Sequence, residues 1–203
     1  MPQSGCRKIP LLGVRAVRAR LAIRVLLACT ASGGACAAED VSIEAERHGS
    51  AVQVTARATL QAPHDLVWKT LTDYDRLREF IPGIRSSRLI EQQGPAAIVE
   101  QSGEARLLLF SFPIEVTVRT VQRPPNAIEV HLLKGNLKQL SGGYRIEPLP
   151  GGRLVLRWSG MIEPEAALPP LIGEYLMRAN VEDQFLGMVR EIERRAREAE
   201  AVK

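Results

Sequence analysis

Apolar residues occupy every second position in two stretches near the start of the folded region. They alternate with polar residues from Val41 to Ala45, the segment RHGS at 47–50 supplies a turn, and the alternation resumes from Val52 to Leu60. A period of two places successive side chains on opposite faces of a β-strand. The pattern predicts a strand or hairpin with one buried face.

The next segment has a helical period. Residues 63–74 place apolar side chains three and four positions apart. A second short helix is predicted to follow, with Asp73 as its N-cap and Leu77, Phe80 and Ile81 on its apolar side. Pro82 and Gly83 end this second helix. The sequence therefore predicts two short helices after the first strand.

From Ile84 to Pro164 the period of two returns, and turn residues interrupt it at 93–95, 124–126, 134–136 and 148–152. This spacing predicts five or six antiparallel strands joined as a meander. The longest strand is expected to have an apolar face made of Leu108, Phe110, Phe112, Ile114, Val116 and Val118. Because one face of the predicted sheet is apolar throughout, another element must cover it.

The last segment supplies that cover. Two prolines at 169–170 open a predicted helix that runs to about Arg197, with apolar residues at helical spacing from Ile172 to Ile192. At about 1.5 Å per residue it is roughly 40 Å long, enough to cross six or seven strands. Its highly charged end is expected to be a solvated helix terminus.

The first 38 residues have the layout of a cleaved secretory signal. They contain basic but no acidic residues, then the stretch VLLACTAS from Val25, then Ala35-Cys36-Ala37 as a cleavage site. The apolar stretch is too short for a transmembrane helix of about 20 residues. We expect an exported protein, periplasmic or secreted. Two alternatives stay open: a cytosolic protein with a basic arm, and a lipoprotein anchored through Cys29.

Removing the leader changes the charge and the cysteine content. The whole chain has a net charge of +4, and loss of the six basic leader residues lowers this to about −2. All three cysteines lie in the leader, so residues 39–203 have no disulfide and no thiolate site. We expect no nucleic-acid partner, and one domain at 39–203 of a size that needs no covalent staple.

The element order is that of the START-like helix-grip fold, and local sequence also resembles that superfamily, known as SRPBCC. Residues 62–83, APHDLVWKTLTDYDRLREFIPG, resemble the cyclase/dehydrase and coenzyme Q-binding branch. Further similar segments are VEQSG at 99–103, LLLFSFP at 107–113, GNLKQLSGGYRIEP at 135–148 and EPEAALPP at 163–170. The resemblance implies an α+β fold, with a curved antiparallel sheet of six to seven strands wrapped around the long C-terminal helix.

The resemblance also implies an elongated cavity between sheet and helix that takes an apolar molecule. A curved sheet and a straight helix cannot touch along their whole length, which agrees with such a gap. Position in the predicted fold selects the ligand-binding candidates, which are Phe80, Ile81, Pro82, Gln101, Phe110, Phe112, Tyr144, Trp158, Tyr175 and Leu176. Tyr144 and Tyr175 each offer a hydroxyl to a ligand carbonyl.

Catalytic chemistry finds little support in the sequence. His48, His64 and His131 share no face of the predicted elements and are each expected at the surface. Alternation places Gln101 on the face opposite Glu100 and Glu104, and a glutamate that pointed into the cavity would have a raised pKa and act as a proton donor. No metal, cofactor or nucleophile motif occurs.

We therefore predict a protein that binds or carries a lipid, quinone or isoprenoid. Its partners would be that hydrophobic small molecule and, transiently, a membrane surface. The alternative is a polyketide cyclase/dehydrase-like enzyme that acts on an apolar substrate in the same cavity, which would need convergent polar groups there.

Overall fold

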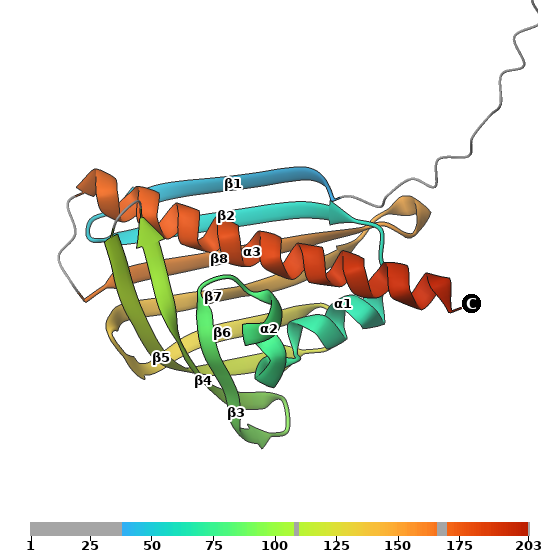
Figure 1. The fold of residues 1–203 in the computed structure, drawn as a ribbon, viewed down its shortest axis with the longest axis horizontal. Coiled ribbons are helices and arrows are strands. Elements are labelled where there is room, and N and C mark those ends of the chain that lie inside the picture. Colours follow the sequence, from blue (N-terminus) through green and yellow to red (C-terminus); the bar gives the residue numbers. More distant parts are fainter. Residues whose placement is uncertain (1–37, 108–109, 166–169, 203) are drawn as a thin grey trace, which may run out of the picture. The chain divides into compact units, whose positions relative to one another are not determined.

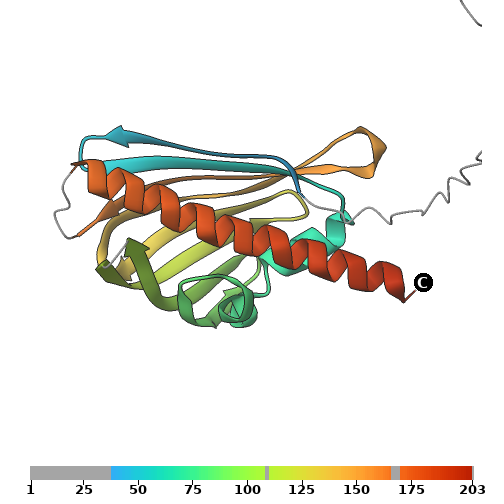
Figure 2. The ribbon, with the colours of Figure 1, turned by 45° about the horizontal axis from the view of Figure 1, so that its top comes forward.

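A computed structural model of the chain describes residues 38–107, 110–165 and 170–202, and nearly all of the predicted leader lies outside the described residues. The described domain is an eight-stranded antiparallel sheet with one long helix lying across its concave face (Figure 1, Figure 2). The α+β class and the helix-grip arrangement are as the sequence predicts.

The strands are β1 Glu39–His48, β2 Ala51–Leu60, β3 Ile84–Gln93, β4 Ala96–Leu107, β5 Phe110–Arg123, β6 Ala127–Gly135, β7 Leu137–Pro148 and β8 Leu154–Pro164. The helices are α1 His64–Leu71, α2 Leu77–Phe80 and α3 Pro170–Ala201. Two short 3-10 turns complete the described elements, η1 Tyr74–Arg76 between α1 and α2, and η2 Pro150–Gly152 before β8.

The strand order across the sheet is β1-β2-β8-β7-β6-β5-β4-β3. Strands β3 to β8 form the predicted meander, and the β1–β2 hairpin joins it through the pairing of β2 with β8. Shifts of register, such as that between Thr117 and Val118 where β5 pairs with β6, mark irregularities of the kind that bend a strand.

The predicted number of six to seven strands is wrong, because eight are present. Residues 39–60 form a full hairpin, so the short helices follow the second strand rather than the first. The meander contains six strands because β4 and β5 are separate strands, paired as far as Leu107 and Phe110. Leu108, which the alternation placed within one long strand, lies outside the described residues, between β4 and β5.

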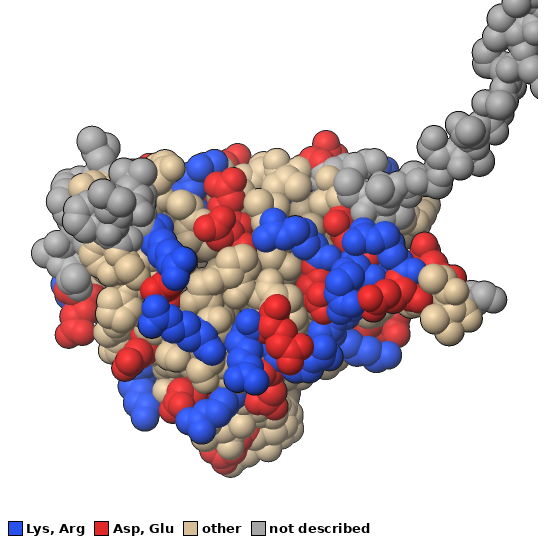
Figure 3. Space-filling view, in the orientation of Figure 1, with Lys and Arg blue, Asp and Glu red and all other residues tan. Residues whose placement is uncertain are grey.

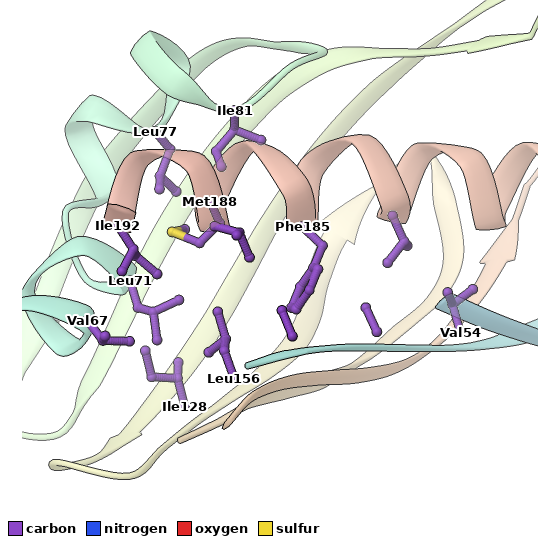
Figure 4. Packing of buried hydrophobic residues seen from close by; sticks show 14 of the residues in the cluster. Val54, Val67, Leu71, Leu77, Ile81, Ile128, Leu156, Phe185, Met188 and Ile192 are labelled. Atoms are coloured by element: carbon purple, nitrogen blue, oxygen red, sulfur yellow. The ribbon is translucent and has the colours of Figure 1, made fainter. Parts of the chain in front are cut away.

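The core lies between α3 and the sheet, beside α1 and α2. Figure 4 shows Phe185, Met188 and Ile192 projecting from α3 toward Ile128 and Leu156 of the sheet. Phe185, Ile192 and Leu156 are almost completely buried. Among the residues that the structure describes, no helix is long and apolar enough to cross a membrane.

Candidate ligand cavity

A cavity of about 200 Å³ lies between α3 and the concave face of the sheet. Its walls are mainly apolar, made by Leu71, Leu77, Ile81, Ile84, Val99, Ala105, Ile114, Val116, Val118, Ile128, Val130, Leu137, Leu140, Ile162, Met177, Val181, Phe185 and Met188. An apolar cavity of about 150 Å³ in another protein binds benzene. The volume therefore suits a compact molecule of one or two rings.

The lining side chains face the cavity because of the periodicity of the strands and of α3. Along β5 the residues Ile114, Val116, Val118 and Thr120 share the inward phase. On α3, the lining residues between Met177 and Met188 recur at spacings of three and four. The cavity is thus the interior of the fold left open where the helix stands off the curved sheet.

A second hollow, of about 360 Å³, adjoins the first beneath the N-terminal part of α3. Four residues line both spaces, namely Ala105, Ile114, Leu137 and Met177. Phe112 and Leu176 line only the second. An elongated ligand therefore has a second apolar space next to the first.

Apart from Glu104, the polar groups of the described cavity lining are neutral, and several already have a partner. Gln184 Nε2 donates to Asn180 Oδ1 at 3.0 Å, and Gln101 Nε2 donates to Ser87 Oγ at 3.3 Å. The Tyr74 hydroxyl lies 3.1 Å from the hydroxyl of Thr120 and also accepts from Gln122.

Tyr144 and Trp158 form an aromatic pair on adjacent strands at the cavity wall. Their ring centroids are 4.9 Å apart and the planes are tilted by 53°. The indole lies against Gly160, where a Cβ would come within 2.9 Å of Trp158 Cζ2, so the strand has no room for a side chain there. Burial raises the pKa of Tyr144 well above its ordinary value, so its hydroxyl stays protonated.

Two polar atoms of this pair have no hydrogen-bonding partner within the described domain. Trp158 Nε1 is buried without one. The hydroxyl of Tyr144 makes no hydrogen bond to a described residue, although Tyr144 lines the cavity. Unpartnered polar groups in an apolar site are costly unless another molecule supplies the partner.

Glu104 is the only charged residue among those described that line the cavity, and its carboxylate is already paired. It bonds Arg85 at 2.5 Å, Ser111 at 2.8 Å, and Arg106. The Ser111 hydrogen bond, together with the two guanidinium groups, lowers the pKa of Glu104. The raised pKa that a catalytic proton donor would need is therefore not found here, and Glu100 is likewise held ionised by Arg88.

Four of the ten predicted binding residues line the cavity, namely Ile81, Gln101, Tyr144 and Trp158. Phe80 instead lies beneath the Arg195 guanidinium, 5.3 Å from its ring centroid, and Pro82 packs against Gly187 of α3. The side chain of Phe110 lies outside the described residues. Binding by any of these residues stays a prediction.

Tyr175 does not face the cavity, contrary to expectation. It is 57% exposed, because the cavity-lining stripe of α3 through Met177, Val181 and Phe185 lies about 200° to 280° around the helix from Tyr175, at about 100° per residue. The sequence reasoning also missed Asn180 and Gln184, which line the cavity. Asn180 lies three residues after Met177 and Gln184 three residues after Val181, and this helical spacing could have indicated that they face inward. Because both are polar, they were not assigned to the buried face.

His48 and His131 are exposed as predicted, whereas His64 is half-buried and its Nε2 has no partner in the described domain. The described residues contain no group of three or more histidine, cysteine or acidic side chains that could hold a metal ion.

At the charged end of α3, Arg190, Arg197 and Glu198 are exposed as predicted, but Glu191 and Arg195 are withdrawn from solvent and form an anchor. Arg195 donates to Asp73 at 2.8 Å and to Glu191 at 2.7 Å, and Arg194 donates twice to Glu191 at 2.8 Å. Asp73 makes no side-chain cap, so its predicted N-cap role is wrong. Hydrogen bonds from Arg194, and more weakly Arg195, outweigh burial and lower the pKa of Glu191 to about 2.

Surface charge on this side of the molecule is mixed. Figure 3 shows basic and acidic side chains interspersed over the face that carries α3. The anchor is part of this pattern. Arg76 forms one ion pair with Asp73 of the anchor and another with Glu79.

The fold is shared with solved structures of low sequence identity. The Zhui aromatase/cyclase of Streptomyces sp. R1128 is 20% identical with a TM-score of 0.61, covering 72% of this chain and 94% of its own. A START superfamily protein of Mycobacterium smegmatis is 14% identical with a TM-score of 0.61, covering 70% and 97%. A STAR-related lipid transfer protein of Xanthomonas axonopodis is 12% identical with a TM-score of 0.53, covering 76% and 99%.

Among curated proteins no sequence matches this chain significantly. Residues 60–184 match the family described as polyketide cyclase / dehydrase and lipid transport, which is more than half of the chain. This match confirms the resemblance inferred from the sequence. The chain therefore belongs to the polyketide cyclase/dehydrase and lipid transport family.

Proposed function

We propose that this domain binds a hydrophobic small molecule in the cavity beneath α3, as a carrier or binding protein. The observation that carries the proposal is the apolar cavity of about 200 Å³ between α3 and the sheet. Burial of apolar ligand surface supplies roughly 25 cal/mol per Å² before the costs of association. A lipid, quinone or isoprenoid would extend from the first space into the adjoining hollow.

The alternative, a cyclase or dehydratase reaction, needs a group that transfers a proton inside the cavity. The described lining offers one carboxylate, Glu104, which is ionised and paired with two arginines. Tyr144 holds its proton more firmly than an ordinary tyrosine does. These two observations favour binding over catalysis.

The first test is to purify the full chain gently from its host, extract it with organic solvent and analyse the extract by mass spectrometry. We expect one apolar molecule in near-stoichiometric amount. A protein free of any extractable molecule, and unable to take up the bicyclic hydrocarbon tetralin, would count against the proposal.

A cavity-filling variant locates the site. Val130 lines the cavity, whereas Val121 lies on β5 outside it. Val130→Trp should abolish uptake of the extracted molecule, and the matched control Val121→Trp should leave it unchanged. Equal uptake by both variants, with both folded by circular dichroism, would place the ligand elsewhere.

We also propose that the protein is exported. The supporting features are the basic, acid-free leader and the confinement of all cysteines to it. N-terminal sequencing of the protein from its host should find a start near residue 38 or 39. An intact Met1 would overturn this proposal, and lipid on Cys29 would replace it by the anchored form.

A further inference from the structure

The wall of the cavity carries hydrogen-bond donors without partners and no unpaired charge. Trp158 Nε1 is a donor only, and it is buried with no partner in the described domain. The neighbouring Tyr144 hydroxyl also lacks one and retains its proton, so it too is available as a donor. A ligand atom that meets this pair must therefore accept a hydrogen bond.

The rest of the described lining limits the charge of the ligand. It contains no lysine, arginine or histidine, so a buried carboxylate or phosphate would find no cation within the cavity. Glu104, the one charged residue of the described lining, is already paired with Arg85 and Arg106, and neither arginine lines the cavity. Burying an unpaired charge costs far more than one hydrogen bond returns.

We propose that the cavity selects an uncharged ring compound whose carbonyl oxygen accepts a hydrogen bond from the Tyr144 hydroxyl, next to the indole of Trp158. This inference rests on the proposed binding function. It makes Tyr144 the residue that fixes the polar end of the ligand. It also excludes ionised fatty acids and phospholipid headgroups from the interior, although both are apolar along most of their length.

Three bicyclic probes of similar size separate the parts of this inference: tetralin, which has no acceptor, 1-tetralone, which has one carbonyl, and 1-naphthoate, which is an anion at pH 7. Calorimetric titration of the full chain gives the Kd of each. We expect 1-tetralone to bind most tightly, tetralin more weakly, and 1-naphthoate at least about a hundredfold more weakly than 1-tetralone.

Tyr144→Phe removes the hydroxyl and keeps the ring that packs on Trp158. It should weaken 1-tetralone about fivefold, as expected for one hydrogen bond, and change tetralin less than twofold. Tyr175→Phe is the matched control, because Tyr175 is exposed on α3, and it should change neither. Unchanged binding of tetralin also shows that the variant is folded.

The possible results separate failure of the Tyr144 anchor from failure of the proposed binding function. If Tyr144→Phe weakens both neutral probes equally or neither of them, Tyr144 is not the anchor. If 1-naphthoate binds as tightly as 1-tetralone, the charge selection is wrong. If the wild-type protein binds none of the probes, tetralin included, the proposed function itself fails for ligands of this size.

Discussion

The C-terminal half of α3, from Gly187 to Ala196, packs against α1 and α2, whereas the N-terminal half, from Met177 to Phe185, covers the cavity, and Met188 lines the cavity at the boundary between the two. In the C-terminal half Val189 and Ile192 are buried almost completely, and the anchor formed by Glu191, Arg195 and Asp73 closes the outer side. In the N-terminal half Asn180 and Gln184 line the cavity instead of packing into the core.

The difference shows how the fold tolerates an empty space in its core. Unfilled volume costs stability because lining atoms lose their contacts. The packed half of α3 fixes the helix to α1 and α2, so the other half keeps its position over the sheet without filling the gap. Stability and binding are thus assigned to different ends of one helix.

The largest loss of stability is expected from a substitution at Gly187, in the packed half of α3. A Cβ there would collide with Pro82 Cδ and lie 2.8 Å from the carbonyl oxygen of Phe80. Gly187→Val should lower the free energy of unfolding by about 3 kcal/mol, measured by urea denaturation. The control is Arg190→Val, which places the same residue on an exposed position of the helix. Similar losses in both would mean that helix propensity, not contact, is decisive.

The ion network comes next. Glu191→Gln removes the carboxylate that Arg194 and Arg195 share, leaving Glu198 as the partner of Arg194 and Asp73 as that of Arg195, and should cost roughly 2 to 3 kcal/mol at pH 7. The control Glu182→Gln removes one exposed pair with Arg178 and should cost under about 0.5 kcal/mol. A loss for Glu191→Gln no larger than its control would show that the network does not anchor the helix.

The stabilisation that Glu191 provides is expected to depend on pH. The folded pKa of Glu191 is about 2, below its ordinary 4.5, so the folded state favours the carboxylate. Its contribution is complete above pH 4.5 and is lost as the pH falls toward 2. The stability difference between wild type and Glu191→Gln should therefore shrink over that interval. A difference that stays constant down to pH 2 contradicts the assignment.

Two valines of α3 compare the halves directly. Val189 is 2% exposed in the packed half, and Val181 is 8% exposed at the cavity. Val189→Ala should cost about 1.5 kcal/mol, and Val181→Ala about half of that, because its side chain has fewer neighbours to lose. Only Val181→Ala should alter the affinity for tetralin. Equal losses of the free energy of unfolding for the two variants would show that the two halves of α3 are packed equally well.

The smallest effect is expected at the exposed side of α3. Tyr175→Ala should change the free energy of unfolding by less than about 0.5 kcal/mol and leave tetralin binding unchanged, since the ring is largely in solvent. A marked loss of binding would restore Tyr175 to the ligand site and contradict its observed position.

Sequence patterns predicted the sheet face of the cavity better than the helix face. Alternation placed Val116, Tyr144 and Trp158 inward, because a strand has two faces and its apolar residues mark one. A helix has a continuous surface, and the polar residues Asn180 and Gln184 blur its inward stripe. The sequence also contains no turn residue between β4 and β5, where the chain is apolar.

The anchor could not be predicted for a different reason. A run of arginine and glutamate at a helix end is usually solvated, and the partner that changes this, Asp73, lies 122 residues away from Arg195. Sequence spacing carries no information about such a distant pair. Only the packing of α3 on α1 and η1 brings them together.

The pairing of β2 with β8 has a consequence for how the protein folds. Val52 pairs with Ile162, so the β1–β2 hairpin joins the sheet only through a strand about 110 residues further along the chain. During synthesis, the neighbours β3 to β7 can pair in order, but the hairpin has no partner until β8 has been made. Contacts so distant in sequence slow folding to milliseconds or seconds. The ribosome will therefore have completed most of the chain before the sheet can close.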